Sequence, residues 1–293
     1  MTFSDQILQF VISGISTGSI YAIVGLGFMI IYSVTRVVNF AQGEFVMLGG
    51  MLSATFYAAD FSLGFAVLLA AALTGVIGIV LYQTVIYPIR GAPAFALILV
   101  TFGVSIIIRG IAMLIWGTDP MRIPYFSRAE PIPISGALLN AQSLWIIIST
   151  AVIALCLFLF FRFTVAGKAF MASAISAFLA GLMGIKPERM GLLAFGISAA
   201  LAAYAGAVMG PLIFPHVGIG LHLSVKGFTA ALIGGLNRIE GVIVGGLALG
   251  VLEALSAGLV SSGSKDAIAL SILLVVLAFR HHGLLGDEEA GQV

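Results

Sequence analysis

Charged side chains are scarce in this sequence. Of its 293 residues only 9% are Asp, Glu, Lys or Arg, whereas soluble domains contain about 25%. Hydrophobic residues make up 61% of the chain, and the mean hydropathy is +1.19. A water-soluble protein could not bury this much apolar surface. The composition therefore excludes a soluble globular domain and predicts a protein that crosses a membrane several times.

Cysteine is almost absent as well. The single Cys156 lies in an apolar run, which excludes a disulfide framework and a thiolate metal cluster. Basic stretches with interleaved aromatic residues are missing, and the net charge is only +1, so we expect no nucleic-acid partner. The first ten residues, MTFSDQILQF, lack a basic start and a small-residue cleavage site. We therefore expect the first span to be permanent rather than a cleaved signal.

Motifs that carry chemistry are also missing. There is no G-x-x-x-x-G-K-[ST] loop for nucleotide phosphates, since Lys168 follows a glycine but lacks the upstream glycine and the following Ser or Thr. If ATP drives this protein, another chain must hydrolyse it. Paired carboxylates, a nucleophile beside a base and a metal-ligand cluster do not stand out either. We expect no enzyme, no cofactor and no bound metal.

Long uncharged stretches fill most of the chain. Charged residues are absent between Asp5 and Arg36, for example, and about 20 residues suffice to cross the hydrocarbon core. Segment 227–236 is apolar but too short to cross alone, so it could be a re-entrant or broken element. We predict an all-α polytopic membrane protein with a single domain, 1–293, and about eight transmembrane helices, at 7–31, 44–59, 62–87, 94–116, 142–161, 190–213, 241–260 and 266–279.

Basic residues indicate the orientation of these spans. Segment 162–189 carries four basic residues against one acidic residue, and Lys and Arg collect in cytoplasmic loops. We therefore assign 162–189 to the cytoplasm, which places 117–140 and the N-terminus outside. The side of the C-terminus stays open, because it depends on whether 227–240 counts as a crossing.

Small residues recur at every fourth position in three spans. Such stripes let helix backbones approach closely, which is how helices associate in lipid. We interpret most of these residues as packing positions, in a compact bundle. The stripes are Gly14, Gly18 and Ala22, then Ser198, Ala202, Gly206 and Gly210, and finally Gly246, Gly250, Ala254 and Gly258.

The stretch NFAQGE, residues 39–44, interrupts apolar sequence with polar side chains. Asn39 and Gln42 have the spacing of a capping box, and Glu44 would suit the positive end of a helix. These residues predict that a helix over 40–59 starts sharply at Asn39. One interpretation is that Asn39, Gln42 and Glu44 line a solute pathway. The alternative is that they cap an ordinary helix at the membrane surface.

The stretch GGLNRIEGVIVGG, residues 234–246, repeats this pattern. Asn237 and Glu240 are again three positions apart and precede an apolar run with a Gly pair. Two capped helix starts, one in each half, indicate a weak internal repeat, and paired broken helices point to the solute site in transporters. A helix N-terminus would suit a substrate carboxylate and Glu44 an ammonium group, as in an amino acid. The surface alternative stays open here too.

Two further charges lie inside predicted spans. Glu253 shares the small-residue stripe of its span, so we expect it to face the bundle as a functional candidate, or to lie near a helix end that water reaches. Arg109 precedes Trp116 by seven residues, and we expect its side chain to snorkel toward the outer interface. His216 and His222 are expected in an outer loop and not as metal ligands.

Three stretches together resemble a known family. They are VVNFAQGEFVMLGG (37–50), GKAFMASAISAFLAGLMGIKPERMGLLAFGISAALAAYAGAVMG (167–210) and KGFTAALIGGLNRIEGVIVGGLALGVLEAL (226–255). In this order and spacing they resemble the branched-chain amino-acid ABC transporter permeases, LivH-type subunit, over nearly the whole chain. Matching residues are Asn39, Phe40, Ala41, Gly43, Glu44, Gly167, Ala172, Gly184, Ile185, Gly234, Gly235, Gly241, Gly245, Gly246 and Gly250.

The resemblance implies a bacterial inner-membrane permease for branched-chain or related amino acids, or amide or urea-like solutes. Its implied partners are a second related permease, two cytosolic ATPases and a periplasmic solute-binding protein, although a homodimer is possible. Three residues depart from the family pattern: Gln42 replaces the common His, Glu240 the usual Pro, and His282 the Pro before the terminal GLLG. The first two touch the candidate site, so the resemblance does not fix the substrate.

The predicted mechanism is alternating access, in which the ATPases dock on 162–189 and push on 167–186. Residues 170–185 could form a short helix along the membrane. The rival hypotheses are an ion-coupled transporter that uses Glu44 and Glu253, and a passive channel. A simple connecting loop is the alternative for 162–189. The predicted pathway residues are Asn39, Gln42, Gly43, Glu44, Gly234, Gly235, Gly241, Gly245 and Glu253. The predicted coupling residues are Gly167, Lys168, Ala172, Gly184, Ile185, Lys186 and Arg189.

Overall fold

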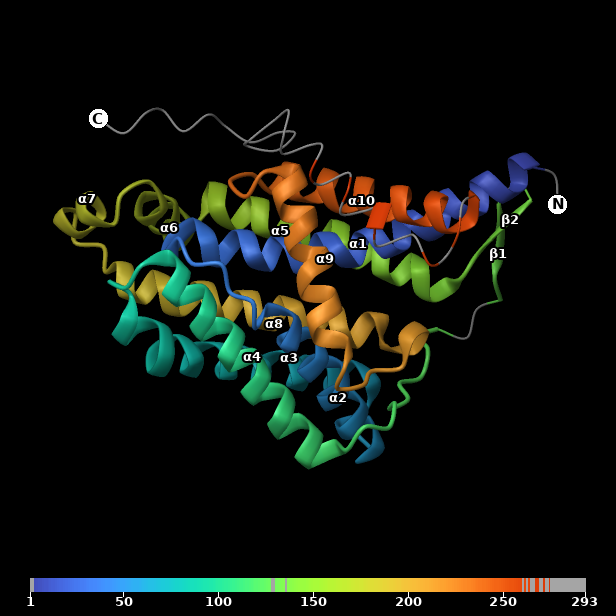
Figure 1. Cartoon of the computed structure of the whole chain (residues 1–293), viewed down its shortest axis with the longest axis horizontal. Helices are drawn as coiled ribbons and strands as arrows, with labels where there is room; N and C mark the ends of the chain where they lie inside the picture. Colours follow the sequence, from blue (N-terminus) through green and yellow to red (C-terminus); the bar gives the residue numbers. More distant parts are fainter. Residues whose placement is uncertain are drawn as a thin grey trace.

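The chain folds into a bundle of helices with one small hairpin (Figure 1). The computed structural model describes residues 3–127, 130–134 and 136–259, and isolated positions between 261 and 274. Its helices are α1 (Phe3–Thr35), α2 (Gln42–Ala58), α3 (Leu63–Leu81), α4 (Ala94–Trp116), α5 (Ala141–Phe163), α6 (Val165–Ile175), α7 (Ala177–Leu182), α8 (Pro187–Ile213), α9 (Ile219–Gly234) and α10 (Ile239–Leu259). Strands β1 (Ile132–Ile134) and β2 (Ala137–Leu139) pair antiparallel.

Six of the described helices are long and apolar enough to cross a membrane. They are α1, α4, α5, α8, α10 and α3 with its extension to Ile89, which continues through a π turn and a 3-10 turn. These six confirm the predicted spans at their positions, and the chain is an all-α, multi-pass membrane protein. The predicted total of eight is not reproduced. The predicted span 44–59 corresponds to α2, which is not among the six, and the segment 266–279 falls largely outside the described residues, as does His282.

The helices α2 and α9 are shorter than a full crossing. They have 17 and 16 residues, or about 24–26 Å at 1.5 Å per residue, against a hydrocarbon core of about 30 Å. The predicted short element 227–236 is the second half of α9. In Figure 1, α9 crosses the bundle steeply relative to α1 and α8, and it contacts α1, α2 and α10. It ends at Gly235, where φ is +99°.

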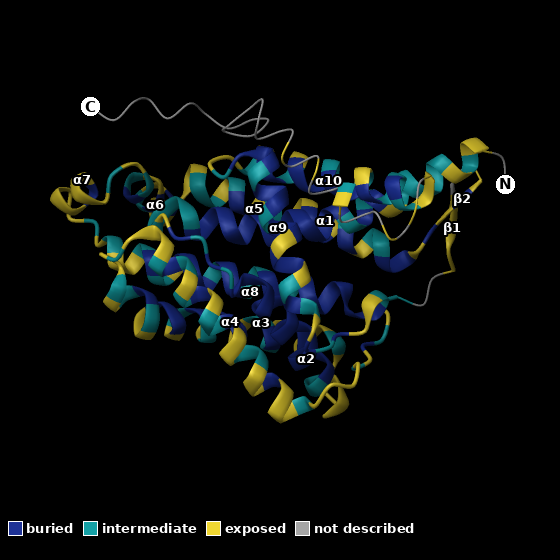
Figure 2. Ribbon diagram, in the orientation of Figure 1, coloured by how far each residue is buried: buried dark blue, intermediate teal, exposed yellow. Residues whose placement is uncertain are grey.

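Two helices form the core of the bundle. In their most apolar windows, 83% of the residues of α1 and 67% of those of α8 are buried, against 17% for α4. Figure 2 shows the same contrast between the buried centre and the exposed α4 and α7. The exposed side chains of α4 are large and apolar, among them Phe95 and Leu114. A lipid-facing surface of this kind is what a membrane helix presents outside its contacts.

The predicted small-residue stripes form the closest helix contacts. Gly14 and Gly18 of α1 lie against the α10 backbone at Val251 and Gly246, where a built Cβ would come within 2.6 Å of those backbones. On α8, a Cβ at Gly206 would collide with the carbonyl oxygen of Val46 in α2. The stripes therefore pair α1 with α10 and α8 with α2, and the packing interpretation of these residues is confirmed.

We predict that Gly206→Ala destabilises the protein, because the added methyl group would collide with the α2 backbone. Backbone cannot move aside as a flexible side chain can. Overpacking of this kind costs about 1–3 kcal/mol. The matched control is Gly103→Ala on α4, where nothing lies within 4 Å of a built Cβ. Thermal unfolding of the detergent-solubilised protein should show a lower midpoint for Gly206→Ala only. Equal midpoints for the two variants would contradict the tight α2–α8 contact.

Candidate functional site

The connection between α1 and α2 is irregular backbone that lies inside the protein. Val37, Asn39 and Ala41 are buried, although they belong to no helix or strand. Backbone polar groups at this depth need partners from the protein. Thr101 of α4 accepts from the Phe40 amide at 3.2 Å. Ser224 of α9 donates to the Phe40 carbonyl at 3.0 Å and accepts from the Gly43 amide at 3.1 Å. Helices α4 and α9 therefore stabilise this break.

The predicted capping box at this break is wrong. Helix α2 begins at Gln42 and not at Asn39, and no side chain caps it. Asn39 Oδ1 accepts from the Ala41 amide at 3.1 Å. Gln42 Nε2 donates to the Ser198 carbonyl at 3.3 Å, and Gln42 Oε1 accepts from the Ser198 hydroxyl at 2.9 Å. The buried side chain of Gln42 makes both of these hydrogen bonds to Ser198 of α8, so it does not cap the start of its own helix.

The polar residues of NFAQGE are buried within the protein. Asn39, Gln42 and Glu44 have no exposed surface, and the pathway role of these residues and of Gly43 stays a prediction. A Cβ at Gly27 of α1 would collide with the Gln42 amide, and a Cβ at Gly43 would collide with the Gly220 carbonyl oxygen of α9. Helices α1, α8 and α9 therefore pack tightly around the polar start of α2.

Glu44 forms a buried ion pair with Arg109 of α4. The Ser105 hydroxyl donates to Glu44 Oε1 at 2.9 Å, and Arg109 Nη2 binds the same oxygen. The expected snorkelling of Arg109 is wrong, because the buried carboxylate attracts its guanidinium inward; its side chain is only 28% exposed. The other oxygen, Oε2, lies against Gly220 in the first turn of α9. The partial positive charge of that helix end favours a carboxylate.

A second buried ion pair joins α9 and α10. Lys226 Nζ lies 3.3 Å from Glu253 Oε2, and the Tyr21 hydroxyl of α1 donates to the same oxygen at 3.0 Å. The side chains of Lys226 and Glu253 are 6% and 7% exposed. The prediction that Glu253 faces the bundle is confirmed. The sequence analysis did not single out Lys226, although a lone Lys in an apolar helix is itself a signal of a buried partner.

Glu253 lies on the wall of a cavity of about 500 Å³ between α1, α8, α9 and α10. Tyr21 and Ser16 of α1 line it as well, and exposed Ser13 and His222 lie at its edge. His216 lies between α8 and α9, whereas His222 belongs to α9 and not to a loop. Among the described residues no three His, Cys, Asp or Glu side chains are grouped to hold a metal ion.

The second predicted helix start lies at the surface. Asn237 and Glu240 are exposed and line a cavity of about 340 Å³ beside Arg162 and Arg238. For these two the surface interpretation is the better one, and the helix starts at Ile239. The glycines of the motif bring α9 and α10 together: Gly234 lies against Gly241, and Gly245 against Ala230. The pathway role of Gly234, Gly235, Gly241 and Gly245 stays a prediction.

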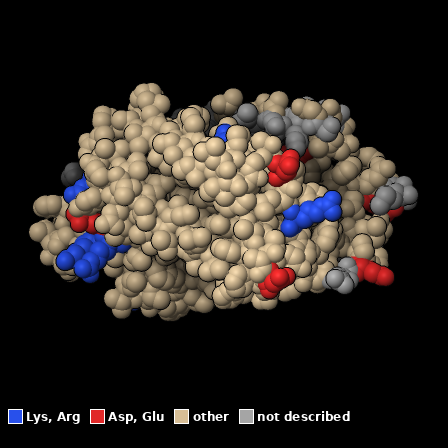
Figure 3. Space-filling model, turned by 90° about the horizontal axis from the view of Figure 1, so that it is seen from below, with Lys and Arg blue, Asp and Glu red and all other residues tan. Residues whose placement is uncertain are grey.

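Segment 162–189 forms one end of the bundle (Figure 1). The single helix expected over 170–185 is wrong: two helices, α6 and α7, meet at Ser176, whose hydroxyl caps α7 at Leu179. Gly167 lies against the backbone of Phe160, and Gly184 has φ +80° after α7. Lys168, Lys186 and Arg189 are exposed, and basic side chains gather at this end in Figure 3. Ala172 and Ile185 are half-buried.

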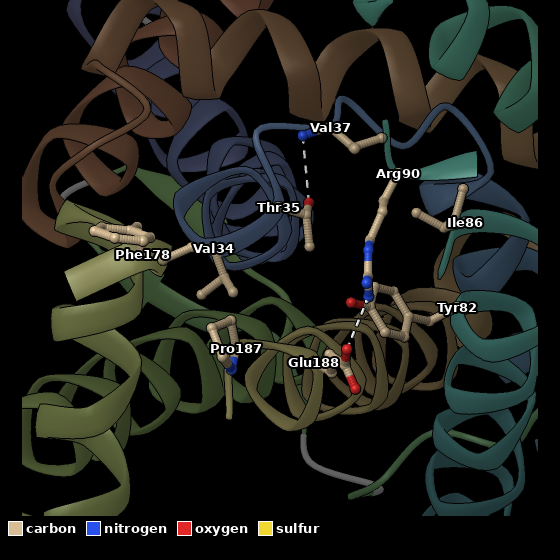
Figure 4. Close-up of a pocket in the computed structure, with 10 residues that line it drawn as sticks. Val34, Thr35, Val37, Tyr82, Ile86, Arg90, Phe178, Pro187 and Glu188 are labelled. Atoms are coloured by element: carbon tan, nitrogen blue, oxygen red, sulfur yellow. Dashed lines mark hydrogen bonds and ion pairs between the residues drawn. The ribbon is translucent and has the colours of Figure 1, made fainter. Parts of the chain in front are cut away.

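Helix α7 exposes apolar side chains. Phe178, Leu182 and Met183 are 75%, 71% and 84% exposed, although basic residues surround them. Behind α7 lies a cavity of about 410 Å³ that reaches Val34 of α1 and Tyr82 after α3 (Figure 4). The exposed pair Arg90–Glu188, at 3.0 Å, lines it. This end therefore combines an exposed apolar surface with a cavity behind α7.

We predict that Arg109→Met destabilises the protein by about 3–5 kcal/mol, because it leaves the Glu44 carboxylate buried without a cation. The double variant Arg109→Met/Glu44→Gln should recover part of that loss, since no charge is left behind. Arg90→Gln, which breaks an ion pair with both side chains more than half exposed, is the control and should change little. Thermal unfolding in detergent measures these three variants and the single variant Glu44→Gln. Additive effects of the two single changes would contradict the pair.

Comparison with known proteins adds to this geometry. The family described as "Branched-chain amino acid transport system / permease component" matches residues 10–278. The high-affinity branched-chain amino acid transport system permease protein LivH of Salmonella typhimurium is 32% identical, over 99% of this chain and all of that protein. BraD of Pseudomonas aeruginosa, named likewise, is 30% identical over 98% of both chains. A probable LivH of Methanocaldococcus jannaschii is 26% identical, over 92% of this chain and 89% of that protein.

The comparison with solved structures found no match. The sequence matches, in contrast, run through both buried ion pairs, the polar start of α2 and the exposed end at α6 and α7. These elements lie in the order that the resemblance in the sequence had indicated. The chain belongs to the family of branched-chain amino acid transport permeases and is of the LivH type.

Proposed function

We propose that this chain is a permease subunit of an ABC importer that moves branched-chain amino acids across the bacterial inner membrane. The observation that carries the proposal is the match to LivH-type permeases over 99% of the chain. We propose as partners a second related permease, two cytosolic ATPases and a periplasmic solute-binding protein. ATP would be hydrolysed on the ATPase chains, in keeping with the absence of a phosphate-binding loop here.

The surface that supports ATPase docking is the end formed by α6 and α7. Exposed Phe178, Leu182 and Met183 offer apolar area, and Lys186 and Arg189 flank it with positive charge. A protein partner buries apolar anchors and surrounds them with a polar rim. Basic charge also favours the cytoplasmic side for this end. Segment 162–189 is therefore our proposed coupling segment.

The proposed mechanism is alternating access. Closure of the ATPases would push α7 toward the cavity behind it, which touches α1, the end of α3 and the start of α8. Because α1 and α8 form the core, a shift at their ends is transmitted along the seams with α10 and α2. The small-residue contacts on these seams hold the helix backbones close together, so that a shift of one helix reaches its neighbour.

An ion-coupled transporter is the less favoured alternative. It would rely on Glu44 and Glu253 as a proton relay, but each carboxylate forms an ion pair with a basic side chain. A protonophore separates the two functions, because it would abolish ion-coupled uptake while ATP-driven uptake continues as long as ATP is maintained.

The first test is co-purification from mildly solubilised native membranes. We expect a second permease and two ATPases with phosphate-binding loops to be recovered with this chain, and the solute-binding protein to stimulate ATP hydrolysis by the complex. Uptake of labelled leucine, isoleucine and valine by the reconstituted complex then tests the substrate. Recovery of the chain alone, with uptake driven by an ion gradient, would overturn the proposal.

We predict that the double substitution Leu182→Ser/Met183→Ser lowers the amount of co-purified ATPase about tenfold, because it removes apolar anchors from the contact. Both side chains are exposed in this chain, so folding should be unaffected. The matched control is Tyr125→Ser, which removes an exposed apolar side chain at the opposite end. Unchanged ATPase recovery with both variants would contradict the docking surface.

A further inference from the structure

We propose that the cavity between α1, α8, α9 and α10 binds a zwitterionic α-amino acid with an aliphatic side chain, and that the amino acid exchanges partners with the Lys226–Glu253 pair. The α-ammonium group would take Glu253, and the α-carboxylate would take the released Lys226. This inference rests on the proposed function and assigns a site to it. Glu44 and Arg109 do not line this cavity.

The charges beside the cavity restrict what can enter. Lys226 and Glu253 are almost completely buried and 3.3 Å apart, so breaking the pair without replacement takes a partner of opposite charge from each of them in a poorly solvated place. A cation alone would replace the lost partner of Glu253 only, and an anion alone would replace that of Lys226 only. A zwitterion supplies both charges at once, so the exchange replaces both lost partners.

The positions of the two residues give the exchange an order. Glu253 and Tyr21 line the cavity, whereas Lys226 does not and reaches Glu253 from the α9 side. An amino acid that enters the cavity therefore meets the carboxylate first. Tyr21 donates to the same oxygen, Oε2, that Lys226 approaches. Its hydroxyl can keep that oxygen hydrogen-bonded while the ammonium group replaces the lysine.

The walls of the cavity suit an aliphatic side chain. Ile20, Met209, Leu212 and Leu223 face the space, and Ala254 widens it on the α10 side. Its volume of about 500 Å³ lies within the range of about 300–1,000 Å³ typical of small-molecule sites. Such sites combine apolar walls with a few convergent polar groups, as here. The charged groups of the amino acid would therefore contact the ion pair, and its aliphatic side chain would contact the apolar walls.

The test is protection of an introduced cysteine in the purified importer complex without its solute-binding protein. Ser13→Cys places a thiol at the cavity edge, in a Cys156→Ser background that removes the native thiol. Tyr125→Cys, at the same end but outside the cavity, is the matched control. The probes are L-leucine, L-leucinamide, which lacks the carboxylate, and isocaproate, which lacks the ammonium group. The rate of alkylation by a thiol reagent is measured with each.

We expect L-leucine to slow alkylation of Ser13→Cys about tenfold at a concentration about ten times its dissociation constant, while leucinamide, isocaproate and the control cysteine show no effect. Lys226→Met should let leucinamide protect, because its ammonium group then replaces the cation that Glu253 has lost. This gain cannot come from misfolding. The double variant Lys226→Met/Glu253→Gln, which removes both charges of this pair, should lose protection by every probe.

Two results would overturn the inference. One is leucine transport by the complete importer without any protection of Ser13→Cys, which would leave the proposed function intact. The other is equal protection by all three probes, or protection by leucine that survives in the double variant. Absence of leucine transport by the complete importer would instead count against the proposed function, so the two failures are distinguishable.

Discussion

The structure depends on satisfying backbone polar groups where water is absent. Between α1 and α2 the chain leaves the helix inside the protein, where its amides and carbonyls cannot turn to solvent. Thr101 and Ser224 supply the missing partners from two other helices. This requirement fixes α4 and α9 against the start of α2. It also explains why the buried face of an otherwise apolar α4 carries Thr101 and Ser105.

Buried charge follows the same rule. Each of the two buried carboxylates has a basic partner on another helix and a hydroxyl that donates to the same oxygen. Charges inside a membrane protein are costly unless paired, and they mark sites with a role in function. Lipid gives little drive for helix association, so polar contacts of this kind hold helices that small-residue packing does not reach. Helix α4, with few buried apolar residues, is held in this way.

The helices could be predicted from the sequence because their signal is local. Uncharged runs predicted the six long spans, and the four-residue stripes predicted close packing, but not which helices pair. The errors for Gln42 and Arg109 arose because each residue contacts a partner far away in the sequence. Gln42 has local capping geometry, but its partner Ser198 is 156 positions away. Arg109 has Trp116 nearby in sequence, but its partner Glu44 lies 65 positions before it. Local spacing carries no information about such pairs.

Helix α9 links the two charged regions. Gly220, in its first turn, lies beneath the Glu44 carboxylate, and Lys226 binds Glu253. The two positions are six residues apart, about 9 Å along the helix axis. A helix of 16 residues moves as a stiff rod, and this one lies across the bundle rather than along it (Figure 1). Any translation or roll of that rod changes the surroundings of both carboxylates together, so neither charged region can be rearranged independently of the other.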